Sequence, residues 1–263
     1  MKVAVYSRDD NPSLKSLLEI IPQAGIEYSL NPESTRGYDI ALSYGGDGTF
    51  LESVRKMGRE IIPILGINSG RLGFLANVTR QEVSKVLGEL SRGEYSVQHR
   101  LMLDIEGGFL KRKNIAVNEF TLQKFGTSMI SVDIQIDGQS VANYWADGVI
   151  VSTPTGSTAY SMSVGGAILT PGCRCFIISP IAPHNLNIRP LVVPDRSKIC
   201  ITGRTRRDQQ FIATVDNLEY HLDSGASFTM GASDRTLDII QLTGSSFYQT
   251  LRNKLFWGID ARN

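Results

Sequence analysis

The first part of the chain alternates short apolar runs with segments whose apolar residues recur every three or four positions. The continuous runs, at residues 2–7, 39–43 and 61–67, predict buried strands. The other periodicity predicts amphipathic helices that each end at a glycine, over residues 12–25, 50–58 and 79–93. Repeated strand-then-helix units predict an open, largely parallel sheet.

Two helix starts carry capping signals. Asn11 and Pro12 suit the N-cap and first turn of the first helix, and Thr79 with Glu82 forms a capping-box pattern before the third. Both patterns satisfy backbone N–H groups that a helix start leaves without partners. They therefore support the two helix predictions independently of hydrophobic periodicity.

Beyond about residue 96 the apolar residues alternate with polar ones, as in Val132, Ile134 and Ile136, before an Asp137-Gly138 hairpin signal. Further short strands are predicted at residues 115–117, 149–152, 199–202, 211–215 and 237–242, and a short helix at 247–255. We expect an α/β domain at residues 1–95, a β-rich domain at 96–240, and a C-terminal segment, 241–263, that packs back on the first domain.

Composition narrows the function classes. The chain has 263 residues, with 27 basic and 26 acidic side chains and a formal charge of +1, which gives no bulk attraction to nucleic acid or membranes. No run approaches the ~18 apolar residues of a membrane span, and the first residues soon turn polar, so we expect a cytoplasmic protein. The odd number of cysteines, Cys173, Cys175 and Cys200, predicts free thiols.

A glycine turn, Gly45-Gly46-Asp47-Gly48-Thr49, follows a predicted strand and opens a helix. No glycine precedes a lysine, so a Walker-A loop is absent, as are the GxGxxG, HExxH and GxSxG motifs. Backbone N–H groups in such a turn bind phosphate, and a carboxylate there suggests a base or a cation contact, hence phosphoryl transfer. The alternative interpretation is an ordinary Asp-Gly turn.

A second glycine-bearing stretch, residues 65–75, also follows a predicted strand. Both stretches would emerge at the same edge of a parallel sheet, where open α/β sheets bind ligands. The alternative is a tight loop with Phe74 and Leu75 buried beneath it.

A hydroxyl-rich segment at residues 152–163 holds seven Ser or Thr side chains and Tyr160, shortly after Asp147-Gly148. Hydroxyls and an aromatic ring suit a nucleotide's phosphates, ribose and base. The alternative is a solvated Ser/Thr loop. The Asn118-Glu119 dipeptide, at the end of a predicted strand, is a weak signal by itself and equally suits a surface strand end.

Taken in order, these motifs closely resemble the bacterial NAD kinase family from about residue 40 to 220. Several further segments extend the resemblance: Leu65-Gly66-Ile67-Asn68, Gly70, Leu72-Gly73-Phe74-Leu75, Gly165-Gly166, Pro180-Ile181-Ala182-Pro183-His184 and Arg189-Pro190. The glycine turn alone is shared with lipid kinases, whereas the hydroxyl-rich segment together with Asn118-Glu119 and Asp147-Gly148 is specific to NAD kinases.

The resemblance implies an enzyme, an NAD kinase that phosphorylates the 2′-hydroxyl of the adenosine ribose of NAD. ATP is the donor, a divalent cation, Mg²⁺, is the cofactor, and NADP is the product. It also implies an α/β amino-terminal domain with an open, largely parallel sheet, a β-rich NAD-binding domain at 96–240, and a homodimer or homotetramer. NAD and ATP are the expected partners; nucleic acid and membrane are not, and no protein metal ligand is singled out.

The resemblance also assigns site residues. Asp47 matches the proposed base, Asn118 and Glu119 the adenine end of the dinucleotide, and Asp147 the nicotinamide side, with Tyr160 near adenine. The remaining nucleotide-binding positions are Gly45, Gly46, Gly48, Thr49, Phe74, Trp145, Thr158, Ala159, Ser161 and Ser163.

Two departures from the family pattern stand out. Many members have a basic residue where this chain has Trp145, and many have Asp-Gly-Gln where it has Asp216-Asn217-Leu218. Two rival functions stay open at this point: a nucleotide sensor that has lost turnover, which an intact Asp47 disfavours, and a lipid kinase, which the hydroxyl-rich segment disfavours.

Overall fold

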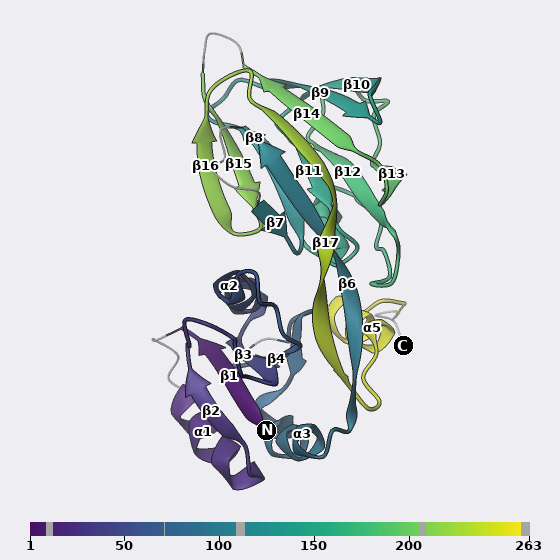
Figure 1. Ribbon diagram of the computed structural model, residues 1–263. Helices are drawn as coiled ribbons and strands as arrows, with labels where there is room; N and C mark the ends of the chain where they lie inside the picture. The colour runs from purple at the N-terminus through teal and green to yellow at the C-terminus, as the bar shows by residue number, and fades with distance from the viewer. Residues whose placement is uncertain (9–12, 71, 109–113, 206–208, 259–263) are drawn as a thin grey trace. The chain divides into compact units, whose positions relative to one another are not determined.

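The computed structural model describes residues 1–258 except 9–12, 71, 109–113 and 206–208 (Figure 1). The described chain divides into two compact units. Unit 1 comprises Met1–His99 and Leu237–Asn263, and unit 2 comprises Arg100–Thr236. Strands β6 (Tyr95–Gly107) and β17 (Ser227–Leu242) each contribute residues to both units.

Unit 1 is built on a parallel sheet in the order β2-β1-β3-β4. These strands are β1 (Lys2–Ser7), β2 (Glu27–Leu30), β3 (Ile40–Gly45) and β4 (Ile64–Asn68). Strand β5 (Ala76–Val78) and the end of β17 both pair with β4, in parallel. Because β1, β3 and β4 are buried on both faces, they read as continuous apolar runs, as the sequence predicted.

The helical segments of unit 1 are α1 (Leu14–Ile20), α2 (Asp47–Met57), α3 (Val83–Ser91), α5 (Phe247–Leu255) and the 3₁₀ turns Ile21–Ala24 and Arg80–Glu82. The capping box of Thr79 and Glu82 is confirmed. The Asn11-Pro12 cap lies outside the described residues. Strands β2 and β5 were not predicted, because each is short and only partly apolar.

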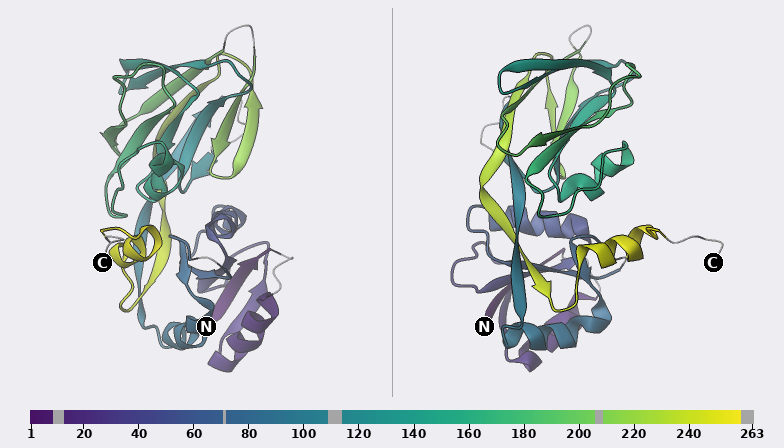
Figure 2. Two further views of the ribbon diagram at one scale, coloured as in Figure 1. Left: turned by 180° about the vertical axis from the view of Figure 1, so that it is seen from behind. Right: turned by 90° about the vertical axis from the view of Figure 1, so that its right-hand side faces the viewer.

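Unit 2 is a sandwich of two antiparallel layers (Figure 2). One layer has the order β13-β12-β11-β8-β15-β16, and β10-β9-β14-β17 forms most of the other. The first comprises β8 (Glu119–Lys124), β11 (Gly148–Ser152), β12 (Cys175–Ile181), β13 (Leu191–Pro194), β15 (Phe211–Val215) and β16 (Leu218–Leu222). The second comprises β9 (Ile130–Ile136), β10 (Gln139–Ala146), β14 (Ile199–Arg204) and the first part of β17, with β6 and β7 (Asn114–Ala116) beside them.

The core of unit 2 lies between these layers. Alternate residues of facing strands enter one buried cluster, as the period-two pattern predicts. Phe120 of β8 and Phe228 of β17 pack with ring centroids 4.7 Å apart. The 3₁₀ turn Gly156–Thr158 and the short helix α4 (Tyr160–Ser163) follow β11. The predicted fold class, an α/β amino-terminal part with a β-rich part after it, is confirmed.

Candidate functional site

The glycine turn in unit 1 carries β3 directly into α2, which begins at Asp47. A Cβ on Gly45 would overlap the side chain of Thr49, so only glycine fits this close approach. Gly46 is the N-cap and provides no side-chain cap. Because a helix start leaves its first N–H groups without helical partners, this one can bind an anion.

The carboxylate of Asp47 does not point back along its own helix. It accepts backbone N–H groups from Phe74 at 2.9 Å, Leu75 at 3.0 Å and Ala76 at 2.9 Å. A Cβ on Gly73 would overlap this carboxylate, so glycine is required there as well. The two glycine stretches therefore meet through Asp47, and the ordinary Asp-Gly turn no longer describes the residue.

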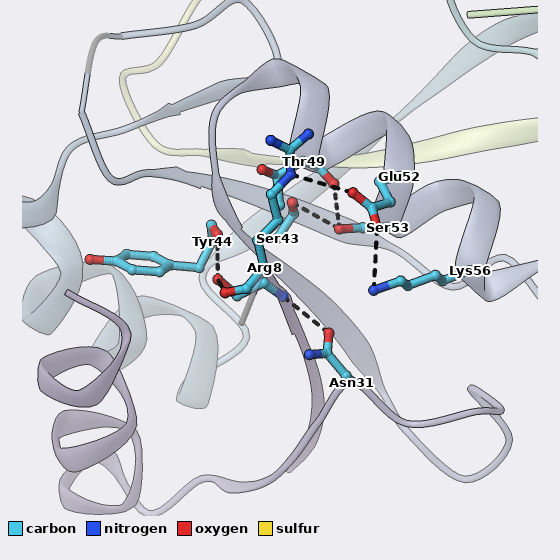
Figure 3. A network of polar contacts seen from close by, with 9 residues as sticks. Arg8, Asn31, Ser43, Tyr44, Thr49, Glu52, Ser53 and Lys56 are labelled. Atoms are coloured by element: carbon cyan, nitrogen blue, oxygen red, sulfur yellow. Dashed lines mark hydrogen bonds and ion pairs between the residues drawn. The ribbon is translucent and has the colours of Figure 1, made fainter. Parts of the chain in front are cut away.

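Three cations pair with carboxylates of α2, the helix that this turn begins. Lys254 of α5 has its Nζ 3.7 Å from Oδ2 of Asp47 and 4.6 Å from the centroid of the Phe74 ring. Arg8 pairs with Glu52 at 3.5 Å, and Lys56 pairs with the same carboxylate at 3.5 Å (Figure 3). Positive charge near a phosphate-binding turn favours an anionic ligand.

Behind the turn, hydroxyls bind β3 to its neighbours. Ser7 of β1 donates to the carbonyl of Tyr44 at 3.0 Å. Ser53 of α2 donates to the hydroxyl of Ser43 in β3 at 3.0 Å (Figure 3). All four residues are buried. Their satisfied hydrogen bonds fix the backbone that presents Asp47.

In unit 2, Asn118 and Glu119 stand at the start of β8 and are only 7% and 8% exposed. Asp216, in the turn between β15 and β16, accepts the N–H groups of Val117 at 2.8 Å, Asn118 at 2.8 Å and Glu119 at 3.2 Å. These bonds hold the Asn118-Glu119 backbone in one place. The surface strand end considered from the sequence is wrong for this dipeptide.

Burial raises the pKa values of both Glu119 and Asp216. Burial, with the nearby charge of Asp216, raises the pKa of Glu119 from its ordinary value of 4.5 to about 8. Burial also raises the pKa of Asp216, to about 6, although its three backbone hydrogen bonds act in the opposite direction. Glu119 is therefore protonated at neutral pH and can donate a hydrogen bond as well as accept one.

The first half of the hydroxyl-rich segment is internal. Thr153 donates to the carbonyl of Val117 at 2.6 Å, Ser157 donates to that of Pro154 at 2.7 Å, and residues 152–157 are all buried. The solvated loop is therefore wrong for this half, and the hydroxyls of Thr153 and Ser157 bond within the protein. A Cβ on Gly156 would overlap the backbone of Asn118, which places the segment directly against that residue.

The second half of the hydroxyl-rich segment lies near the C-terminal end of β8. Tyr160 is 36% exposed, and its hydroxyl lies 3.4 Å from Oε1 of Gln123. Asp147 pairs with Lys124 at 2.7 Å. From Glu119 to Gln123 is about 13 Å at roughly 3.3 Å per strand residue.

Four of the remaining predicted site residues of unit 2 lie in or beside α4, and the fifth, Trp145, lies in β10. Thr158 donates to the carbonyl of Thr155 at 3.3 Å, and Ser161 is fully buried with its hydroxyl 3.3 Å from that of Ser179. Ala159 precedes α4 and Ser163 ends it. The carbonyl of Trp145 accepts the N–H of His184 at 2.7 Å.

Sequence reasoning missed four residues that the structure brings to these clusters: Gln123, Lys124, Asp216 and Lys254. Asp216 begins a recognisable Asp-Asn turn, which is the sequence signal that marks its position. The others stand in an ordinary strand and helix, so no local signal marks them.

The family assignment follows from comparison with known proteins. The model of the ATP-NAD kinase N-terminal domain matches residues 6–95, and that of the ATP-NAD kinase C-terminal domain matches residues 117–242. The chain belongs to the ATP-NAD kinase family. These are kinase transferases, and the expected family is confirmed.

The sequences of two bacterial relatives align with this chain over most of their length. The NAD kinase of Cytophaga hutchinsonii is 44% identical over 230 residues, 86% of this chain and 78% of that protein. The NAD kinase of Bacteroides fragilis is 38% identical over 258 residues, 97% of this chain and 88% of that one.

Two solved structures share the fold. An NAD kinase from Archaeoglobus fulgidus in complex with ATP is 28% identical, with a TM-score of 0.81, and covers 97% of this chain and 99% of that one. A yeast NADH kinase complexed with NADH is 24% identical, with a TM-score of 0.88, and covers 99% and 89%. Among the described residues, no helix is both long and apolar enough to cross a membrane.

Proposed function

We propose that this chain transfers the γ-phosphoryl group of ATP to the 2′-hydroxyl of the adenosine ribose of NAD, giving NADP and ADP, with Asp47 as the base. The observation that carries the proposal is the Asp47 carboxylate, fixed by three N–H groups beside the open start of α2. Oδ1 accepts two of them and Oδ2 only one, so Oδ2 keeps one acceptor position. That position takes the proton of the attacking hydroxyl.

In this reaction the ribose oxygen forms a bond to the γ-phosphorus, and the bond from that phosphorus to the bridging oxygen of ADP breaks. The proton of the hydroxyl goes to Oδ2 of Asp47. The N–H groups at the start of α2, in the turn of Gly45, Gly46, Gly48 and Thr49, hold the phosphates. The Archaeoglobus relative with ATP bound supports ATP as donor.

The dinucleotide belongs, in this proposal, to the surface along β8. Asn118 and Glu119 bind its adenosine end, and Glu119 contributes a carboxyl O–H. Two buried oxygens, Oε2 of Glu119 and Oγ1 of Thr155, have no hydrogen-bond partner within the described part of the chain. A ribose hydroxyl or an adenine nitrogen would satisfy them, since a buried polar atom left unpaired is costly.

The other residues take supporting roles. Tyr160 stacks on the dinucleotide, Asp147 contacts the nicotinamide side, and Trp145, Thr158, Ala159 and Ser163 line the dinucleotide surface. Phe74 supports Asp47, and the fully buried Ser161 supports α4 through its contact with Ser179. The proposal also includes the cytoplasm as location and a homodimer or homotetramer as the assembly, as expected from the family resemblance.

The divalent cation is assigned to the substrate. Across the described residues, no group of three or more His, Cys, Asp or Glu side chains could hold a metal ion. Asp47 has most of its acceptor positions occupied, so it offers at most one contact. This donor set does not form a protein cage, and Mg²⁺ commonly binds through substrate phosphates.

The direct test incubates the pure protein with NAD, ATP and Mg²⁺ and measures NADP, with mass spectrometry locating the phosphate. We expect NADP with the phosphate on the adenosine ribose, and a rise in melting temperature with NAD but not with diacylglycerol or sphingosine. Phosphorylation of a lipid at a comparable rate would instead support the rival lipid kinase. NAD binding without any NADP would support the nucleotide sensor.

A further inference from the structure

The C-terminal helix α5 delivers one charged side chain to the proposed base. Lys254 lies in its last turn, and its Nζ stands 3.7 Å from Oδ2 of Asp47 and 4.6 Å from the centre of the Phe74 ring. Phe247, in the first turn of the same helix, packs against Phe74 with centroids 6.3 Å apart. The helix thus contacts both the base and the segment that holds the base.

This ion pair contributes little to folding. About a third of each side chain is exposed, at 33% for Lys254 and 31% for Asp47, and the separation exceeds a hydrogen bond. Exposed pairs of this kind typically contribute about 0–1 kcal/mol to stability. A stabilising role for the fold therefore does not account for a cation at this position.

The position of Lys254 relative to the carboxylate is specific. Oδ1 of Asp47 is held by two backbone N–H groups, but Oδ2 by one, so the second acceptor position of Oδ2 is the part that the loop leaves unconstrained. Lys254 stands beside that oxygen. Its charge attracts that oxygen while the 74–76 backbone holds the rest of the carboxylate.

We propose that Lys254 is a positioning residue of the phosphoryl-transfer site, acting through Asp47. Its ammonium fixes the direction in which Oδ2 presents its remaining lone pair, and the contact of the same ammonium with the Phe74 ring keeps it beside the segment that binds Asp47. The proposal rests on the proposed function, because it assigns Lys254 a role only if Asp47 accepts the proton. It gives the C-terminal segment a part in the reaction.

The test uses Lys254→Met, which keeps an unbranched side chain and removes the charge, and Lys254→Arg, which keeps the charge. Arg252→Ala, an exposed cation two residues earlier on α5, is the matched control. We expect Lys254→Met to lower kcat for NADP formation about 10- to 100-fold, the scale of a small misplacement of a reacting group. KM for NAD and ATP and the melting temperature should change little, Lys254→Arg should recover part of kcat, and Arg252→Ala should match wild type.

A double-mutant cycle separates positioning from any other cause. In an Asp47→Asn background, Lys254→Met should lower the residual kcat by less than about twofold, because its effect passes through the carboxylate. Lys254→Met with wild-type kcat, an equal loss in both backgrounds, or Lys254→Arg no more active than Lys254→Met would each overturn the inference. If the wild-type protein made no NADP, the proposed function itself would fail, which is a different result.

Discussion

Asp216 and Glu119 are joined through both of their backbones and through a side chain. Oδ1 of Asp216 accepts the N–H of Glu119 at 3.2 Å, and the carbonyl of Glu119 accepts the N–H of Asp216 at 2.9 Å. The turn at Asp216 is thereby tied to the start of β8. Because both carboxyls are drawn into the same buried region, their protonation is coupled to the folding of unit 2.

Glu119→Gln should change how stability depends on pH. The pKa of Glu119 rises from 4.5 to about 8 on folding, so between these values the folded state holds a proton that the unfolded chain has lost. Wild-type stability therefore falls as pH rises through this window, at up to about 1.4 kcal/mol per pH unit, and the neutral Gln escapes this loss. Urea unfolding at pH 5, 6, 7 and 8 should show that the free energy of unfolding of the variant rises relative to that of wild type as pH increases. If the two free energies changed in parallel with pH, the prediction would be wrong. Glu33→Gln, at an exposed glutamate, is the control.

Asp216→Ala should destabilise the protein by about 2–4 kcal/mol, because it leaves the three backbone N–H groups of residues 117–119 without their acceptor. Asp137→Ala is a matched control. Asp137 also has a positive φ in a hairpin turn, but accepts only the N–H of Lys198, on an exposed surface. We expect it to cost about 1 kcal/mol or less in denaturant unfolding. Equal losses of stability for the two variants would show that the three hydrogen bonds accepted by Asp216 are not specially important.

Gly73→Ala should disturb the proposed base, whereas Gly70→Ala should not. A Cβ at Gly73 would overlap the carboxylate of Asp47, but one at Gly70 meets nothing within 4 Å. Moving that carboxylate by about 1 Å should lower kcat roughly 100-fold. Steady-state NADP formation by the two variants provides the comparison, and wild-type turnover by Gly73→Ala would show that the carboxylate tolerates displacement.

Asp47→Asn should leave NAD affinity largely intact and lower turnover by about two to four orders of magnitude, the range for loss of a positioned general base. An amide has only one acceptor oxygen, so it also cannot accept all three N–H groups. The melting temperature should therefore fall, and turnover must be measured well below it. NADP formation at nearly the wild-type rate would exclude Asp47 as the base.

Tyr160→Ala should weaken NAD binding by about 1–3 kcal/mol, the range for loss of a stacking ring, with little effect on folding. Tyr160→Phe should retain most of the affinity, because the hydroxyl makes only a 3.4 Å contact with Gln123. Calorimetry measures both. An unchanged affinity together with a lowered melting temperature for Tyr160→Ala would make the ring part of the core.

The sequence by itself determined those features that adjacent residues encode. The strand at 2–7, the capping box of Thr79, the Asp137-Gly138 turn and the glycine turn before α2 all depend on short-range backbone preferences, and each is found where predicted. Tertiary structure decided the contacts between distant segments. Asp47 meets Phe74, Lys254 meets Asp47, and Asp216 meets residues 117–119 only because strand pairing and helix packing join them. It also turned the hydroxyls of Thr153 and Ser157 inward, because a buried loop must satisfy its own backbone before it can offer anything to a ligand.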